Sequence, residues 1–325
     1  MPEPSESGLL WQPAASQEAI VQRAALLGYL RNFFSLRQVL EVETPVLGRY
    51  GITDPHIDSV GARASFLENG GWLQTSPEYP MKRLIAAGSG PIYQVARVFR
   101  DGERGRRHNP EFSMLEWYRP GFTDADLMSE TADLVCGFLG CEVPARIRYQ
   151  DLFCDHAGID PMSISTEALQ AKSAEWVSGE LSESLGRDDC LNLLLTHEIE
   201  PKLASAPPFF LTDFPASQAA LARIKGSGRH ATAHRFELYI GGLELCNGYW
   251  ELTDPAEQAR RFAEDNRQRR LMGKDELESD PNLLAALQAG MPDCAGVALG
   301  LDRLLMLKLG TTDISDVLTF PAERV

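Results

Sequence analysis

Two segments of the chain, 92–100 and 111–119, contain side chains whose types and spacing could do chemistry. Both segments alternate with the period of two that β-strands show. A hairpin that joined them would bring onto one floor the side chains of Arg100, Phe112, Glu116 and Tyr118. Such a floor offers a guanidinium for a phosphate, a ring for a base, and an acid and a phenol for an amine. The strand pattern alone favours a plainer interpretation, an amphipathic hairpin with a solvated basic loop.

A second predicted hairpin, 236–252, turns at a pair of glycines and carries two acids and an amide. Glu244 and Glu251 are an odd number of residues apart, so a regular strand would point them to opposite faces. A β-bulge at Asn247 and Gly248 would put both carboxylates on one face. The other interpretation is that Asn-Gly forms a further turn, which leaves two unrelated surface acids.

Several further elements must position these hairpins. The helix after Thr75 has good local reasons to begin there, because Ser76 can cap it, Pro77 suits its first position and Glu78 favours its positive end. A strand that leads into a helix at 296–307 places Arg303 in the first turn, where the helix dipole disfavours a cation. We expect helices at 16–37, 76–87, 124–139, 166–178, 188–198 and 254–272, strands at 39–45, 72–75 and 207–214, and a mobile loop at 225–234.

The composition limits the class of protein. The 325 residues carry a formal net charge of −15, whereas proteins that bind nucleic acid over a broad surface usually have a basic face. Basic residues cluster only at 97–107 and 260–270, and we expect the second cluster to be the solvated face of a helix. The six cysteines form no CxxC pair, which predicts free thiols in a reducing cytosol. Neither a signal peptide nor a membrane-spanning run is predicted.

The amino-acid sequence of the first hairpin resembles a motif of a known family. FRDGERGRRHNPEF followed by MLEWY resembles motif 2 of class II aminoacyl-tRNA synthetases, and most closely that of their lysyl branch. The helix and strand that end in ETP resemble motif 1, and GVALGLDR near the C-terminus resembles motif 3. The resemblance spans 16–325. It implies an α+β fold, an antiparallel sheet flanked by helices, that works as a homodimer.

The resemblance also implies roles for residues. It assigns catalysis to Arg100, Glu244 and Arg303. It assigns ATP binding to Arg100, Asp101, Gly102, Asn109, Phe112, Glu244, Leu245, Gly300 and Arg303. It assigns substrate binding to Ser76, Pro77, Glu78, Glu116, Tyr118, Glu251 and Ala298. ATP-bound Mg²⁺ is expected at Glu244 with Asn247 near it, because carboxylate and amide oxygens suit magnesium. Glu251 is expected to receive the distal ammonium of a diamino acid.

Three departures from the lysyl enzymes narrow the resemblance. Only an arm, 1–15, precedes the predicted catalytic domain, 16–325, so no anticodon-binding domain is expected. Gly102 stands where motif 2 usually has an acid, with Glu103 next to it. Ala298 stands where the lysyl enzymes have glycine, and its methyl would reshape the pocket against α-lysine. These features resemble a bacterial family of stand-alone lysyl-synthetase paralogues that attach (R)-β-lysine to a lysine of translation elongation factor P.

Three other functions agree less well with the sequence than this one. A free-standing enzyme that charges tRNA should have a basic surface, which the net charge disfavours. An ammonia-dependent asparagine synthetase should have a basic pocket for an acidic side chain, whereas Glu78, Tyr118 and Glu251 suit a cation. A non-catalytic paralogue that binds an amino acid should lack the residues that bind ATP. The sequence therefore predicts a cytoplasmic, ATP-dependent ligase that uses Mg²⁺.

Overall fold

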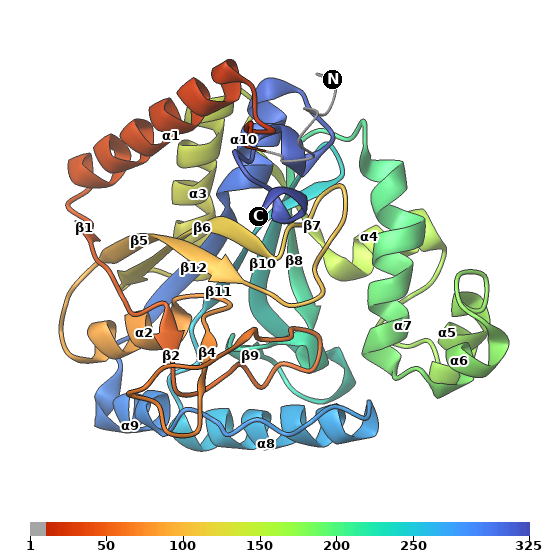
Figure 1. Ribbon diagram of the computed structural model, residues 1–325. Helices are drawn as coiled ribbons and strands as arrows, with labels where there is room; N and C mark the ends of the chain where they lie inside the picture. The colour runs from red at the N-terminus through yellow and green to blue at the C-terminus, as the bar shows by residue number, and fades with distance from the viewer. Residues whose placement is uncertain (1–10) are drawn as a thin grey trace. The chain divides into compact units, whose positions relative to one another are not determined.

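The computed structural model of the protein describes residues 11–325, which divide into two compact units (Figure 1). Unit 1 contains the described part of Met1–Pro120, together with Thr253–Pro292 and Ala298–Val325. Unit 2 contains Gly121–Leu252 and Asp293–Val297. Of the predicted arm 1–15, residues 1–10 lie outside the described part. Its last residues are held by backbone hydrogen bonds, since the N–H groups of Ala14 and Ala15 donate to the carbonyls of Thr319 and Leu318 at 2.8 and 3.1 Å.

The sheet of unit 1 is built around a long antiparallel hairpin. Strand β5 (Ile92–Phe99) pairs with β6 (Glu111–Pro120), and β1 (Leu40–Glu41) adds to β5 in parallel. The strand order is β1-β5-β6-β12, where β12 (Cys294–Gly300) is the strand that passes from unit 2 into unit 1. A second, three-stranded sheet has the order β2-β4-β3, and its strands are β2 (Leu47–Gly48), β4 (Gly71–Leu73) and β3 (Gly61–Ala62).

The helices of unit 1 cover these strands. They are α1 (Gln17–Leu36), α2 (Glu78–Ala86), α8 (Pro255–Leu271), α9 (Pro281–Gly290) and α10 (Leu301–Leu309), with 3₁₀ turns at Ile314–Asp316 and Ala322–Arg324. Figure 1 shows α8 and α9 side by side along one edge of the unit. Helix α1 begins where predicted, because Ser16 Oγ accepts a hydrogen bond from the N–H of Ala19 at 3.1 Å. One prediction for α8 is wrong: Arg269 is buried and donates to the carbonyls of Asp275 and Asp54.

Unit 2 contains the remaining strands, which pair in both antiparallel and parallel fashion. Their order is β12-β11-β10-β8-β7, with β9 also paired to β10. The strands are β7 (Ala145–Arg148), β8 (Phe209–Pro215), β9 (Ile224–Lys225), β10 (Thr232–Ile240) and β11 (Leu243–Trp250). The loop predicted at 225–234 is shorter than expected, because Lys225 in β9 pairs with Thr232 in β10, on either side of a 3₁₀ turn at Gly228–His230. Its mobility stays a prediction.

Helices enclose an aromatic core in unit 2. They are α3 (Asp124–Leu139), α4 (Tyr149–Ala157), α5 (Thr166–Ser173), α6 (Gly179–Ser184) and α7 (Arg187–Leu194), followed by a π turn at Leu195–Ile199 and 3₁₀ turns at Glu200–Leu203 and Ala216–Gln218. The predictions for α3 and for a helix at 188–198 are confirmed, the second as α7 continued by the π turn through Ile199. The helix predicted at 166–178 ends earlier, at Ser173. The ring of Tyr149 packs between those of Phe153 and Phe214, with centroids 4.5 and 5.0 Å away. No helix within residues 11–325 is long and apolar enough to cross a membrane.

One glycine in unit 2 is required by close packing, which gives a test of the fold. Gly248 in β11 lies opposite Phe236 in β10, and a Cβ atom at position 248 would lie 2.7 Å from Phe236 Cε1. Since Phe236 is fully buried, its ring has little room to move.

We expect Gly248→Ala to destabilise the protein by about 1–3 kcal/mol, the usual range for overpacking a core. Gly28→Ala is the matched control. A Cβ at Gly28 would meet nothing within 4 Å, and alanine in a helix is favoured over glycine by roughly 0.5–1 kcal/mol. Thermal unfolding of both variants checks this, and an unchanged Tm for Gly248→Ala would contradict it.

Candidate active site

The predicted floor of the first hairpin is confirmed by the strand register. Val98 lies opposite Phe112, and Gln94 lies opposite Glu116, so the side chains at these positions share a face. The guanidinium carbon of Arg100 lies 5.2 Å from the centroid of the Phe112 ring. This face of unit 1 therefore brings a cation and an aromatic ring next to a buried acid.

Glu116 is the centre of a hydrogen-bond network on this floor. Its carboxylate is 1% exposed and accepts hydrogen bonds from Ser76 Oγ and from the Tyr118 hydroxyl, both at 2.6 Å. Burial, followed by the charge of Glu78, raises the pKa of Glu116 to about 7. The predicted cap of α2 needs a correction: Pro77 is the N-cap residue, and Ser76 precedes it while accepting from the N–H of Glu78 at 3.0 Å.

Sequence reasoning missed a buried cation beside this network. Lys82 is 1% exposed, and its Nζ lies 2.6 Å from Glu78 Oε1. The spacing of four residues within a helix, acid first, was the available signal. The charge of Lys82 also opposes the rise in the pKa of Glu116, whereas the charge of Glu78 adds to it. Two acids in this network therefore face one buried cation. A group of this kind suits a single ammonium.

The loop between β5 and β6 explains why glycine stands at position 102. Gly102 has φ +75°, a left-handed conformation that side chains rarely adopt, and its N–H donates to Asp101 Oδ1 at 2.9 Å. An acid stands at the next position instead, and Glu103 Oε1 lies 3.5 Å from Arg100 Nη1. The predicted roles of Asp101 and Gly102 toward ATP stay predictions.

Two residues predicted to bind adenine also fix this loop. Asn109 is buried, its Nδ2 donates to the carbonyl of Glu111 at 2.6 Å, and its Oδ1 accepts from the N–H of Ala322 at 3.0 Å. Arg303 Nη2 lies 2.7 Å from His108 Nε2, in the first turn of α10 as predicted. Gly300 is the N-cap of that helix. Both side chains thus hold the loop in place, and their contacts with ATP remain predictions.

The predicted bulge in the second hairpin exists, but its predicted position is wrong. Tyr239 lies opposite Glu244 while Leu238 lies opposite Cys246, so the extra residue of β11 is Leu245. The expected consequence still follows. One inserted residue changes the alternation, so Glu244 shares a face with Asn247. By the same alternation Glu251, which follows β11, points to that face.

Sequence reasoning also missed a buried ion pair on this face of unit 2. Arg235 Nη2 lies 2.5 Å from Glu237 Oε1, and Arg235 Nε donates to Asn247 Oδ1 at 3.2 Å. The hydroxyl of Tyr239 donates to Glu237 Oε2 at 2.9 Å. Burial raises the pKa of Glu237 to about 7; the charge of Arg235 opposes this and that of Glu244 adds to it. The alternation of Arg235, Glu237 and Tyr239 was the signal that could have found them.

This face fits a divalent cation in the chemistry of its donors. Glu237 and Glu244 are close enough that the charge of one raises the pKa of the other, and a shared cation would relieve that repulsion. The oxygen of Asn247 is already engaged by Arg235, so the amide is less suited to the metal than predicted. Residues 11–325 contain no cluster of three or more His, Cys, Asp or Glu side chains placed to hold a metal without another ligand.

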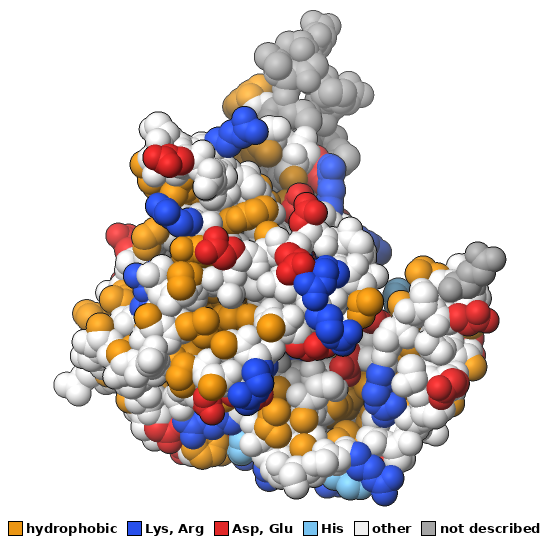
Figure 2. All heavy atoms as spheres, turned by 90° about the horizontal axis from the view of Figure 1, so that it is seen from below, with side chains coloured by type: hydrophobic (Ala, Val, Ile, Leu, Met, Phe, Trp, Pro, Cys, Tyr) orange, Lys and Arg blue, Asp and Glu red, His pale blue; other side chains and the backbone are white. Residues whose placement is uncertain are grey.

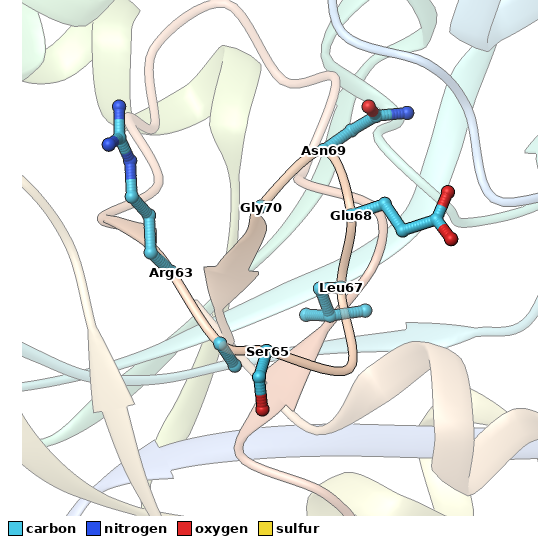
Figure 3. Close-up of a pocket in the computed structure, with 7 residues that line it drawn as sticks. Arg63, Ser65, Leu67, Glu68, Asn69 and Gly70 are labelled. Carbon is cyan, nitrogen blue, oxygen red and sulfur yellow. The ribbon is translucent and has the colours of Figure 1, made fainter.

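The pocket shown in Figure 3 lies apart from this chemistry. It is lined by a loop of unit 1, with Arg63, Leu67 and Glu68 among its residues, and includes none of the predicted site residues. The candidate residues form two groups, one within each unit. The first contains Ser76, Glu78, Arg100, Phe112, Glu116, Tyr118, Ala298 and Arg303, and the second contains Arg235, Glu237, Glu244, Asn247 and Glu251.

Comparison with known proteins gives a family and close relatives. The family model described as tRNA synthetases class II (D, K and N) matches residues 9–324. Relatives named elongation factor P–(R)-beta-lysine ligase are similar over nearly their whole length. The one from Pasteurella multocida is 46% identical, covering 97% of this chain and 98% of the relative. That from Sodalis glossinidius is 48% identical with the same coverage. That from Mannheimia succiniciproducens is 49% identical, covering 95% and 97%.

The raised pKa of Glu116 predicts a pH-dependent stability. Its carboxyl titrates near 4.5 when unfolded and near 7 when folded, so the folded state binds the proton more tightly. The resulting stability is present below pH 4.5 and is lost as the pH rises through 7. We expect the Tm of Glu116→Gln, relative to wild type, to rise by roughly 5 °C between pH 5 and pH 8.

Thermal unfolding at both pH values checks this. Glu111→Gln is the control, because Glu111 is an exposed acid at the start of the same strand. A Tm difference between Glu116→Gln and wild type that stays constant with pH would contradict the buried, protonated acid.

Proposed function

The chain belongs to the family of class II tRNA synthetases of the D, K and N type, and from this membership we propose that it is an ATP-dependent, AMP-forming ligase. It activates (R)-β-lysine as an aminoacyl-adenylate and transfers it to a lysine side chain of translation elongation factor P. The observation that carries the proposal is the identity of 46–49%, over nearly full length, with relatives named for this reaction.

The first step joins a carboxylate to a phosphate. A carboxylate oxygen of the amino acid attacks the α-phosphorus of ATP, the bond to the bridging oxygen breaks, and pyrophosphate leaves. Such a step depends on positioning and on charge compensation rather than on a covalent protein intermediate. Arg100 is suited to hold both anionic groups, because a guanidinium can donate to two oxygens at once. Phe112 offers a ring on which adenine would stack, with Arg303 on the other side of the base.

Magnesium would be held by Glu237 and Glu244, the two neighbouring acids of unit 2. When bound it would neutralise part of the charge on the phosphates of ATP. Arg235 keeps Glu237 in place through its ion pair and orients Asn247 through Oδ1. Leu245, the bulged residue, has no partner residue opposite it in β10 and is the part of this group that we assign to ATP.

The two amino groups of the substrate would be bound by separate acids. Ser76, Glu78, Glu116 and Tyr118 form the network in unit 1 that suits one ammonium, and Glu251 in unit 2 would receive the distal one. In the second step the neutral Nε of the acceptor lysine attacks the carbonyl carbon of the adenylate. An amide bond forms, the bond to the phosphate oxygen breaks, and AMP leaves.

We further propose that the enzyme is a cytoplasmic homodimer without a broad tRNA-binding surface. The net charge of −15 supports the last point, as do the exposed arginines of α8, which pair with acids of the same segment. Figure 2 shows acidic and basic side chains interspersed over one face of the protein. An acceptor protein would then replace tRNA as the partner of the second step.

The proposal is tested by ATP–pyrophosphate exchange with (R)-β-lysine, α-lysine and aspartate, followed by the intact mass of elongation factor P. We expect strong exchange with (R)-β-lysine and a mass gain of one lysyl unit on the acceptor. Exchange with α-lysine and transfer only to tRNA would make the chain a lysyl-tRNA synthetase instead. No exchange with any amino acid would make it a binding protein.

Arg100→Ala should lower kcat/KM for exchange by about 100-fold or more, because it removes a cation that compensates charge in the transition state. Arg97→Ala is the matched control: Arg97 lies on the same strand, is exposed, and points to the opposite face. Its kcat/KM should stay within roughly threefold of wild type. Equal losses in both variants would contradict the role of Arg100.

Ala298→Gly should shift the substrate preference toward α-lysine. Ala298 packs against the cluster of Ala96, Val98 and Met114, beside Phe112, so its methyl shapes the floor. We expect the ratio of kcat/KM for α-lysine to that for (R)-β-lysine to rise by about tenfold, the scale of one methyl group in a pocket. Exchange assays with both amino acids measure the ratio, and an unchanged ratio would show that the methyl does not select the substrate.

A further inference from the structure

We propose that Arg223 is a positioning residue for Glu251, and that it acts through a bracket formed with Trp250 and Asp293. The bracket fixes the end of β11 where Glu251 leaves the strand, and thereby sets how well the enzyme distinguishes substrates with a distal ammonium from those without one. This inference rests on the proposed function, because it takes Glu251 as the acid that receives that ammonium.

The guanidinium of Arg223 makes three contacts within unit 2. Its Nε donates to the main-chain carbonyl of Glu251 at 2.7 Å, its Nη2 forms an ion pair with Asp293, and its carbon lies 4.9 Å from the centroid of the Trp250 ring. Trp250 Nε1 donates to the same carboxylate of Asp293 at 2.8 Å. Each member therefore contacts the other two, which restricts the rotamers of all three side chains.

The main chain on both sides of Glu251 is fixed by the same segments. The N–H of Arg223 donates to the carbonyl of Trp250 at 2.9 Å, and the N–H of Glu251 donates to the carbonyl of Cys294 at 2.9 Å. Glu251 itself is 1% exposed. Glu251 follows the end of β11 and forms an isolated bridge with Ala222, so these contacts position its main chain.

His234, which pairs with Asp124, also contacts Trp250. The ring of His234 meets that of Trp250 edge-on, with centroids 4.9 Å apart, and its Nδ1 lies 2.9 Å from Asp124 Oδ2. The N–H of His234 also donates to the carbonyl of Arg223 at 2.8 Å. The indole is thus held between a histidine and a guanidinium, and the bracket is part of the packed structure rather than a lone surface ion pair.

The charges of the bracket explain why it can serve an ammonium site. An arginine bound directly to the carboxylate of Glu251 would compete with the substrate cation. Arg223 donates instead to the carbonyl oxygen of that residue, and its charge is compensated by Asp293. Glu251 is therefore positioned through its main chain, by a cation whose charge is compensated by Asp293.

The test compares (R)-β-lysine with (R)-3-aminohexanoate, the same β-amino acid without its distal amine, in ATP–pyrophosphate exchange. Arg223→Met should lower the ratio of kcat/KM for the two acids by tenfold or more, mainly through a higher KM for (R)-β-lysine, with kcat within about threefold of wild type. Arg223→Lys keeps a cation near Asp293 and Trp250 but lacks the Nε donor, so we expect an intermediate ratio.

Arg148→Met is the matched control, because Arg148 forms an exposed ion pair with Asp151 in the same unit and makes no contact with Glu251. Its ratio should equal that of wild type. Variants with a lowered Tm but an unchanged ratio would overturn the inference and leave Arg223 a structural residue. If Arg223→Met does not fold, the kcat/KM ratio of Arg223→Lys for the two acids tests the inference, and a ratio equal to that of wild type would overturn it. Absence of exchange in the wild type would instead refute the proposed function.

Discussion

Burial of acids is the constraint on which the candidate site depends. Removing a carboxylate from water costs several kcal/mol unless fixed donors replace the lost hydration. In both units, hydrogen-bond donors replace the hydration of a buried acid. Glu116 receives two hydroxyl groups, from Ser76 and Tyr118, while Glu237 receives a guanidinium and a phenol, from Arg235 and Tyr239. In each case burial still raises the pKa to about 7, so neither acid is fully stabilised as an anion.

An incompletely stabilised acid is a useful binding group. Near neutral pH it exchanges between the protonated and ionised forms at little cost in free energy, and a cationic ligand shifts it to the ionised form. The hydrogen-bond donors compensate only part of the negative charge of each acid, so a bound cation would supply the rest of the stabilisation. Lys82 illustrates the balance, since it pairs with Glu78 while its charge also opposes the rise in the pKa of Glu116. A second buried cation on Glu116 would stabilise the fold while removing the site's attraction for an ammonium.

Much of the fold could be predicted because local rules and tertiary packing agree. The alternation of the first hairpin fixed which side chains share a face, and the observed register of Val98 with Phe112 follows from it. Ser16 and Thr123 mark helix starts with side chains that accept the first free N–H groups. The resemblance in motif 2 named candidate residues of unit 1, and the structure shows that one of them, Glu116, lies in a buried hydrogen-bond network.

The failures arose where long-range contacts decide the local structure. The bulge falls at Leu245 rather than two residues later, because Gly248 is needed opposite the ring of Phe236 and cannot leave the ladder. Residues 225–234 look like a loop in composition, yet Lys225 pairs with Thr232, and Thr232 and Ala233 also pair with β8. Arg235 lies in the same strand, β10, and was missed because the predicted hairpin began one residue later, at 236. The alternation of Arg235, Glu237 and Tyr239 places these side chains on one face, but it does not show whether that face is buried, because burial depends on which strands and helices pack against it.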